Sequence, residues 1–161
     1  MDPPQKLDGA NVLYIDDNVD LRMLVAAVFT RHGATVTACS SAEDGILRLV
    51  ESRFDIVVCD LNMPPGLDGY DLVHALRRME GGDQSRVATP TVLVSGNALD
   101  PAIQRRFADF QAYIQKPFNP TRLVDVIKRL IEVDSEAVKF GSLASWEANQ
   151  ERGQGPEHGG T

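Results

Sequence analysis

The chain has 161 residues, a length that suits one domain with a sizeable core. Its content of 43% hydrophobic and 24% charged residues is typical of a globular protein and excludes a largely disordered one. Nucleic-acid binding depends on neutralising phosphates, so the formal net charge of -7 and the lack of a basic cluster argue against it, and we expect protein partners.

Short apolar runs alternate with segments of helical periodicity along residues 11–133. The first half predicts a strand at 12–15, a helix at 19–31, a strand at 34–38, a helix from Ser40 or Ser41 to about 51, and a strand at 54–59. Gly33 can end the first helix, and a serine can cap the second. The strand at 54–59 is apolar almost throughout, which is typical of a strand covered on both faces.

The same alternation continues through the second half. It predicts a helix at 70–79, a polar connection at 80–89, a strand at 91–94, a helix from 100–101 to about 108, a strand at 112–115 and a helix from 119–120 to about 131. Both of the last two helices begin with Asp or Asn followed by Pro, a typical cap and first position. Strands that alternate with helices favour an α/β fold, with parallel strands joined by right-handed crossovers and helices on both faces.

The chain divides into an N-terminal extension at 1–10, one domain at 11–133, and a tail at 134–161. The tail lacks a sustained apolar period, so we expect it to be mostly disordered. No apolar run approaches the roughly 20 residues of a membrane span, and the polar start does not resemble a signal peptide. Cys39 and Cys59 lie in apolar runs without metal-ligand spacing, so we expect buried, reduced thiols in a cytoplasmic protein with no membrane partner.

Reactive side chains stand at the carboxyl ends of four of the predicted strands. Asp16 and Asp17 follow the first strand, Asp60 the third, Ser95 the fourth and Lys116 the fifth. In open α/β sheets this edge forms the ligand crevice. Three carboxylates brought together repel one another unless a cation joins them. Hard oxygen ligands without His or Cys favour Mg²⁺.

This set of groups fits phosphoryl transfer, in which positioning and charge neutralisation dominate. Asp60 is the candidate nucleophile and would form a mixed anhydride on its carboxylate. Mg²⁺ would withdraw charge from the phosphoryl group, and Lys116 would supply a second positive charge. Ser95 could hydrogen-bond a remaining phosphoryl oxygen.

Four segments in order resemble the motifs of the receiver domains of two-component systems: VLYIDD at 12–17, VVCDLNMPPGLDG at 57–69, VLVS at 92–95 and YIQKPF at 113–118. The resemblance covers residues 11–131. It implies a flavodoxin-like, doubly wound (βα)5 fold with a five-stranded parallel sheet of order 2-1-3-4-5. It also implies a phosphorelay signalling domain that is not an enzyme beyond its own phosphorylation and dephosphorylation. The stretch before the fourth strand and residues 107–113 also resemble receivers of hybrid histidine kinases.

The resemblance gives the strand-end residues specific roles. Asp60 corresponds to the phosphoacceptor and Lys116 to the phosphate-binding lysine. Asp17 and Asp60 correspond to direct metal ligands, Asp16 acts mainly through water, and the backbone carbonyl of Asn62 completes the protein ligands.

Further positions correspond to the family's switch and loop residues. Ser95 corresponds to the switch hydroxyl, and Tyr113 to the switch aromatic whose rotamer follows phosphorylation. The bond before Pro117 is expected to be cis. The loop 63–69 contains one residue more than the family pattern, which bears on loop geometry and phosphorylation kinetics while the ligand set stays intact.

The resemblance implies a histidine kinase or phosphotransfer protein as donor and a downstream protein as target. The chain can be a stand-alone regulator or a receiver module of a longer protein.

Two other functions fit the sequence less well. A phosphatase-like hydrolase with an Asp nucleophile needs a second Asp where Asn62 stands, and an FMN carrier needs a phosphate loop where residues 16–18 would repel phosphate. A metal-free scaffold is disfavoured because every ligand position is filled. Asn62 and Asn97 either flank the path of hydrolytic water or are ordinary polar loop residues.

Overall fold

A computed structural model describes residues 5–63, 65–81, 88–98, 100–105 and 109–132. The expected disordered tail at 134–161 lies outside the described residues. So do the end of the helix expected to reach 108 and most of the connection expected at 80–89.

The alternation of strands and helices expected from the sequence is confirmed. The elements are β1 (Asn11–Ile15), α1 (Val19–Arg31), β2 (Thr35–Cys39), α2 (Ala42–Glu51), β3 (Ile56–Asp60), α3 (Gly69–Gly81), β4 (Thr91–Ser95), α4 (Pro101–Gln104), β5 (Ala112–Gln115) and α5 (Pro120–Glu132). The largest difference in bounds is α4, which ends at Gln104 where a helix to about 108 was expected. The third strand begins two residues later than expected, and α3 continues two residues further.

The five strands form one parallel sheet in the order β2-β1-β3-β4-β5, which confirms the expected topology. Ile15, the last residue of β1, is in register with Cys39 on one side and Cys59 on the other. Asp60 is in register with Val94. Because β1, β3 and β4 are adjacent and parallel, the residues at their carboxyl ends meet at one edge of the sheet.

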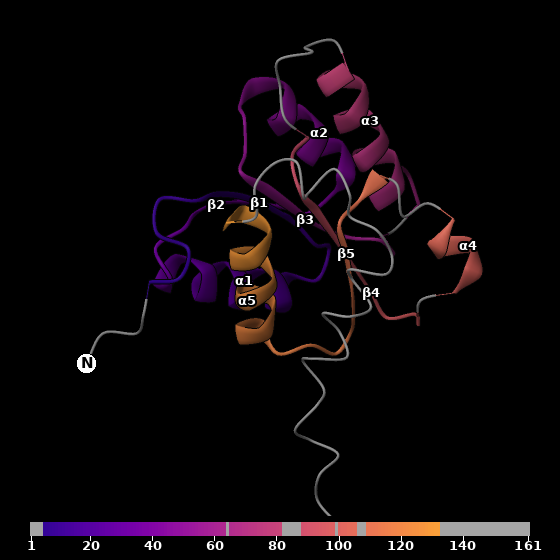
Figure 1. Ribbon diagram of the computed structural model, residues 1–161. Coiled ribbons are helices and arrows are strands. Elements are labelled where there is room, and N and C mark those ends of the chain that lie inside the picture. The colour runs from indigo at the N-terminus through magenta and orange to yellow at the C-terminus, as the bar shows by residue number, and fades with distance from the viewer. Residues whose placement is uncertain (1–4, 64, 82–87, 99, 106–108, 133–161) are drawn as a thin grey trace, which may run out of the picture.

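Helices cover both faces of the sheet, as Figure 1 shows: α1 and α5 lie on one face, and α2 and α3 on the other. Successive residues of a strand point to opposite faces, so Tyr14 packs on the α1 and α5 side and Ile15 on the α2 and α3 side. Every residue of β3 and β4 is buried. This double coverage explains why both strands are nearly continuous apolar runs in the sequence.

Side-chain caps fix where the helices begin, and glycine ends α1. The side chain of Asn18 accepts a hydrogen bond from the Leu21 amide at 2.9 Å. Ser41, rather than Ser40, caps α2, since its hydroxyl accepts a hydrogen bond from the Asp44 amide at 3.1 Å. Gly33 follows α1 with a φ of 92°, a left-handed conformation that favours glycine.

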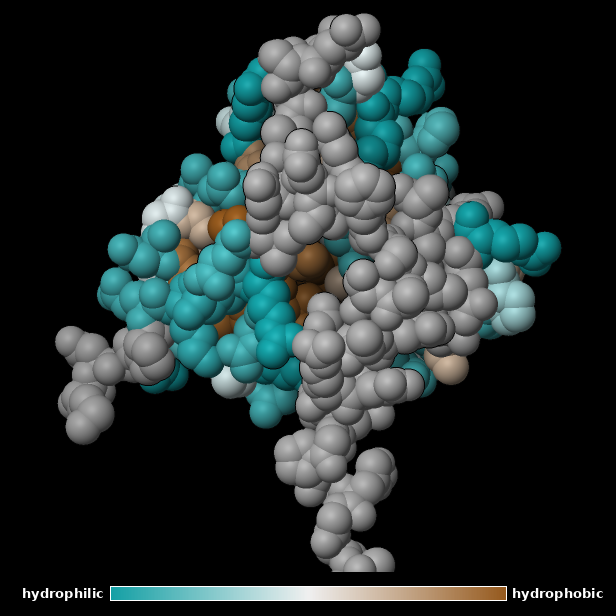
Figure 2. All heavy atoms as spheres, in the orientation of Figure 1, coloured by the Kyte–Doolittle hydropathy of each residue, from teal (hydrophilic) through white to brown (hydrophobic). Residues whose placement is uncertain are grey.

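The segment before β1 packs against the same core. Leu7 is 2% exposed, and its amide donates a hydrogen bond to the carbonyl of His32 at 2.8 Å. Lys6 forms an ion pair with Asp125 of α5 at 2.7 Å. In the space-filling view the described residues are mainly hydrophilic at the periphery, with hydrophobic atoms toward the middle (Figure 2). Among the described helices, none has the length and apolar character of a membrane span.

Candidate functional site

The fold brings together the three aspartates predicted to share a cation. Carboxylate oxygens of Asp16, Asp17 and Asp60 all lie within 4.8 Å of one another. Asp16 and Asp60 are buried, with 1% and 4% of their surface exposed, whereas Asp17 is exposed. The cluster therefore has one open side, through which a metal ion and a phosphoryl group can enter.

Lys116 bridges two of these carboxylates. Its ammonium nitrogen lies 2.8 Å from Asp60 Oδ2 and 3.3 Å from Asp16 Oδ2. The Lys116 amide donates a hydrogen bond to the Ser95 carbonyl at 2.6 Å, which fixes the chain just beyond β5. The peptide bond between Lys116 and Pro117 is cis, as the resemblance implied.

The charges at this edge do not balance. Burial raises the pKa of Asp60, although its hydrogen bond to Lys116 and the charge of Lys116 lower it. Burial opposes the charge on Lys116, but the hydrogen bond to Asp60 and the charges of Asp60 and Asp16 together raise the pKa of the ammonium. Three carboxylates facing one ammonium leave an excess of negative charge that a divalent cation would neutralise.

Asn62 connects Asp60 to Ser95. Its amide donates a hydrogen bond to Asp60 Oδ1 at 3.0 Å, and its side-chain Nδ2 donates one to Ser95 Oγ at 2.7 Å. The amide of Asn97 donates a second hydrogen bond to the same hydroxyl at 3.1 Å. From the sequence we expected Asn62 to supply a backbone carbonyl to the metal, and its side chain either to flank the path of water or to be an ordinary loop group. The hydrogen bond from its side chain to Ser95 was not predicted.

Tyr113 is buried at the same edge, with 2% of its surface exposed. Its hydroxyl donates a hydrogen bond to the carbonyl of Asn97 at 2.6 Å, and burial raises the pKa of the phenol. The residue expected to act as the switch aromatic is therefore linked, through Asn97 and Ser95, to the surroundings of Asp60.

The sequence reasoning also missed the contacts that hold Asp16. The hydroxyl of Tyr14 donates a hydrogen bond to Asp16 Oδ2 at 2.9 Å, and the Asn18 amide donates one to Asp16 Oδ1 at 2.9 Å. Arg22 of α1 donates a hydrogen bond to the backbone carbonyl of Asp16 at 2.8 Å. The spacing of two between Tyr14 and Asp16 was the available signal, because such residues lie on the same side of an extended chain.

The available donors fit a hard divalent cation. Asp17 and Asp60 can supply carboxylate oxygens, Asn62 a backbone carbonyl, and Asp16 a contact through water. Among the described residues this is the one cluster of three or more acidic, His or Cys side chains close enough to share a metal. Cys39 and Cys59 are buried free thiols, as expected, and do not join it.

The loop 63–69, which contains the extra residue, contacts α2 through Leu67 and approaches the end of β3 at Gly69. The Leu67 amide donates a hydrogen bond to Glu43 Oε1 at 2.8 Å, and this bond lowers the pKa of Glu43. Gly66 has a φ of 134°, a conformation that favours glycine. A Cβ atom on Gly69, the first residue of α3, would lie 3.0 Å from the carbonyl oxygen of Asp60.

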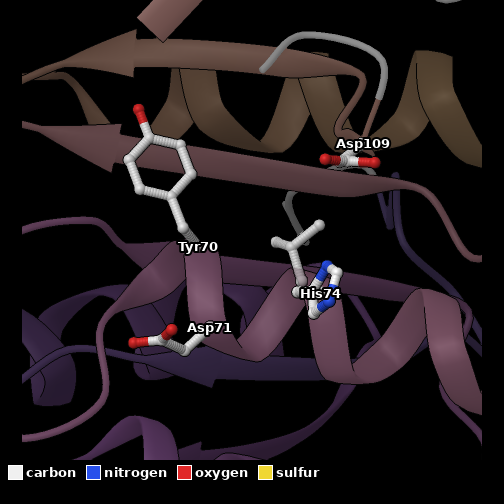
Figure 3. Close-up of a pocket in the computed structure, with 5 residues that line it drawn as sticks. Tyr70, Asp71, His74 and Asp109 are labelled. Atoms are coloured by element: carbon white, nitrogen blue, oxygen red, sulfur yellow. The ribbon is translucent and has the colours of Figure 1, made fainter.

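A separate pocket of about 290 Å³ lies between α3 and Asp109. Tyr70 and His74 reach it from α3, as Figure 3 shows. Asp71 also borders it, but its carboxylate accepts a hydrogen bond from the Asp68 amide at 2.8 Å. The strand-end residues do not line this pocket, so it is distinct from the aspartate cluster.

Comparison with known proteins shows which family the chain belongs to. The family model described as the response regulator receiver domain matches residues 12–128. The transcriptional activator protein PfeR of Pseudomonas aeruginosa is 32% identical over 135 residues, which cover 80% of this chain and 41% of that protein. The sensory/regulatory protein RpfC of Xanthomonas campestris pv. campestris is 26% identical over 150 residues, which cover 81% of this chain and 20% of that protein. The chain thus spans less than half the length of either relative.

Solved structures agree with this placement. The chemotaxis response regulator CheY4 of Vibrio cholerae superposes with a TM-score of 0.65 at 27% identity, covering 75% of this chain and 98% of that one. The receiver domain of the sensor histidine kinase PA1611 of Pseudomonas aeruginosa, determined with a magnesium ion in its active-site cleft, has a TM-score of 0.66 at 24% identity and covers 78% of this chain and 99% of that one. With a family model that matches most of its length and a fold that superposes on those structures, this chain belongs to the response regulator receiver domains of two-component systems.

Proposed function

We propose that this receiver domain accepts a phosphoryl group on Asp60 from a histidine kinase or a histidine phosphotransfer protein. Mg²⁺ would be held by Asp17, Asp60 and the Asn62 carbonyl, with Asp16 acting through water. The observation that carries the proposal is the meeting of three carboxylates within 4.8 Å at the edge of the sheet, with Lys116 on two of them.

The groups around Asp60 suit it to act as the nucleophile. One of its carboxylate oxygens would bond to phosphorus while the bond from phosphorus to the donor's imidazole nitrogen breaks, and that nitrogen keeps the electron pair. Lys116, already 2.8 Å from Asp60 Oδ2, would neutralise charge on the transferred group. When bound, Mg²⁺ supplies further positive charge against the phosphoryl oxygens.

The signal would leave the site through Ser95 and Tyr113. The Ser95 hydroxyl accepts hydrogen bonds from Asn62 and Asn97. A phosphoryl oxygen on Asp60 would attract that hydroxyl, and the segment at Asn97 that holds the Tyr113 hydroxyl would move with it. Phosphorylation would thus shift an existing equilibrium at the surface formed by α4, β5 and α5, where a downstream protein would bind.

In this proposal the protein carries out no reaction beyond its own phosphorylation and dephosphorylation, and it acts in the cytoplasm. We place the receiver at residues 11–133, with an extension at 1–10 and a tail at 134–161. A protein target is favoured over nucleic acid by the net charge of -7. A phosphatase-like hydrolase stays disfavoured because Asn62 stands where such an enzyme needs a second aspartate.

Labelling with acetyl phosphate and Mg²⁺ tests the proposal. The wild-type chain should give a retarded band on a phosphate-affinity gel, and Asp60→Asn should give none. Asp20→Asn is the matched control, since Asp20 is an exposed aspartate in the first turn of α1 and lies outside the cluster. Equal labelling of Asp60→Asn and the wild type would refute the assignment of Asp60.

A further inference from the structure

Asp16 is held by the protein far more completely than Asp17. Asn18 donates a hydrogen bond to Asp16 Oδ1, and Tyr14 donates one to Asp16 Oδ2, both at 2.9 Å. Lys116 lies 3.3 Å from the same Oδ2. Across the part of the chain that the structure describes, the carboxylate of Asp17 receives no hydrogen bond. The two neighbouring aspartates are therefore prepared for different tasks.

Tyr14 is well placed to hold its partner. It is 1% exposed, and its ring packs edge-to-face against Phe29 with the ring centroids 6.0 Å apart. Burial, together with the nearby charge of Asp16, raises the pKa of the phenol far above its usual range, so the hydroxyl keeps its proton and donates. A ring held in the buried core beside Phe29 brings its hydroxyl to one defined point, 2.9 Å from Asp16 Oδ2.

Two groups donate hydrogen bonds to Asp16 Oδ2, the Tyr14 hydroxyl and the Lys116 ammonium, and they differ in whether they also contact another acceptor. Lys116 is shared with Asp60, at 2.8 Å, and would turn toward a phosphoryl group on Asp60. Among the described residues the Tyr14 hydroxyl donates to Asp16 alone. Its contribution is neutral, so it holds the carboxylate without adding a charge to the site.

We propose that Tyr14 is a positioning residue whose hydroxyl keeps Asp16 from becoming a direct ligand of the metal. The inference rests on the proposed Mg²⁺ site. Mg²⁺ takes about six oxygen ligands, and a third direct aspartate would take a place needed by water or a phosphoryl oxygen. Tyr14 thus reserves the direct contacts for Asp17, Asp60 and the carbonyl of Asn62.

This role predicts opposite effects on metal binding and on phosphorylation. A carboxylate oxygen that already accepts a hydrogen bond gives less of its charge to a cation. Without the Tyr14 hydroxyl, the buried carboxylate of Asp16 would bind Mg²⁺ directly, which strengthens binding. The phosphoryl group would then find fewer open places on the metal, which slows transfer to Asp60.

The test uses the full chain with Tyr14→Phe, which removes the hydroxyl and keeps the ring. By isothermal titration calorimetry its Kd for Mg²⁺ should fall about tenfold, in line with the loss of one hydrogen bond to a charged group. Its melting temperature in EDTA should be lower than that of the wild type, and Mg²⁺ should raise it by more. At saturating Mg²⁺ its rate of labelling by acetyl phosphate should be reduced.

Thr91→Val is the matched control, because it removes a fully buried hydroxyl at the opposite end of the sheet. It should lower the melting temperature equally with and without Mg²⁺ and leave the Kd for Mg²⁺ unchanged. A purely structural role for Tyr14 would give the same pattern in Tyr14→Phe, and that result would overturn the inference. If the Phe variant does not fold, Tyr14→Leu, which also lacks the hydroxyl, is put to the same test.

The two proposals fail in different ways. If the wild-type chain takes up no Mg²⁺ in the titration, the proposed function is wrong. If the wild type binds Mg²⁺ and Tyr14→Phe binds it with an equal or higher Kd, only the role of Tyr14 is wrong.

Discussion

The two ends of the sheet both bury polar side chains, but they do so differently. We call the edge with Asp16, Asp17, Asp60, Ser95 and Lys116 the carboxylate end. The opposite edge is the arginine end, whose members are Arg77, Glu80, Thr89, Thr91 and Gln111.

At the arginine end Arg77 pairs with Glu80, and it also donates a hydrogen bond to Thr91 Oγ1 at 3.2 Å. The Thr89 amide donates one to Glu80 Oε2 at 2.7 Å, and the Thr91 amide donates one to Gln111 Oε1 at 2.7 Å.

The arginine end is balanced, whereas the carboxylate end is not. Among the residues that the structure describes, Arg77 and Glu80 offset each other, and no buried side-chain nitrogen or oxygen lacks a hydrogen-bond partner. A closed network of this kind stabilises one arrangement of the chain. At the carboxylate end three acids face one ammonium, an arrangement that costs stability until a cation arrives. The excess of negative charge therefore distinguishes the proposed functional end of this fold from the balanced arginine end.

Breaking the arginine end should give the largest loss of stability. Arg77→Met leaves the carboxylate of Glu80, which is 7% exposed, without its cation. We expect the free energy of unfolding to fall by about 3 kcal/mol in urea titrations. The Kd for Mg²⁺ should stay at the wild-type value, because the change lies at the other end of the sheet.

The double variant Arg77→Met with Glu80→Gln serves as the control. It removes both charges, so it should be more stable than Arg77→Met alone. If the single variant loses less than about 1 kcal/mol, the pair is a surface-type contact and the contrast between the two ends is lost.

Adding metal should stabilise the carboxylate end by a smaller amount. At a free Mg²⁺ concentration of ten times its Kd, linkage gives a gain of about 1.4 kcal/mol in the free energy of unfolding. Asp17→Asn should lose most of this gain, because Asp17 is the exposed direct ligand of the proposal. Denaturation with EDTA and with Mg²⁺ measures both quantities. An Asp17→Asn variant that gains as much as the wild type would remove Asp17 from the site.

Alkaline pH should lower the stability of the whole fold gradually, through a buried thiol on β2 that lies outside the carboxylate end. Burial and, next, the charge of Asp44 raise the pKa of Cys39 at the end of β2 from 9.0 to about 11. The unfolded chain releases this proton near pH 9 while the folded chain still holds it, so the thiol stabilises the fold below pH 9 and loses this effect as the pH rises toward 11. Unfolding free energies measured across this range should fall. The fall should be shallower in Cys39→Ala and unchanged in slope in Arg77→Met.

The smallest effect is expected at the loop 63–69, which connects the end of β3 to α3. Glu43→Gln weakens the bond to the Leu67 amide on an exposed surface. The Kd for Mg²⁺ should change by less than about twofold, since exposed contacts of this kind contribute little. A larger change in the Kd of Glu43→Gln, measured by the same calorimetric titration, would show that this loop contributes to metal binding at the carboxylate end.

Much of this arrangement could be predicted from the sequence. Apolar runs and caps located the elements to within a few residues, and parallel pairing placed Asp16, Asp17, Asp60, Ser95 and Lys116 at one edge. The order of the strands came from the family resemblance, because periodicity does not say which strands are neighbours.

The contacts between side chains could not be predicted in the same way. Glu80 was assigned to the start of a polar connection, but it lies in the last turn of α3, because its burial against Arg77 and the Thr89 amide extends the helix. The bond from Asn62 to Ser95 joins residues that are far apart in the chain. Only the packed fold shows that such side chains meet.

The close approach of Gly69 to the carbonyl of Asp60 has a consequence for how the chain tolerates change. The backbone leaves the end of β3 and returns to it at the start of α3, so the two ends of the intervening loop lie in contact with each other. Lengthening a loop whose ends are already closed costs little free energy. We therefore expect the stretch around Gly66 to tolerate the insertion of a short epitope or reporter peptide while Asp60 keeps its place.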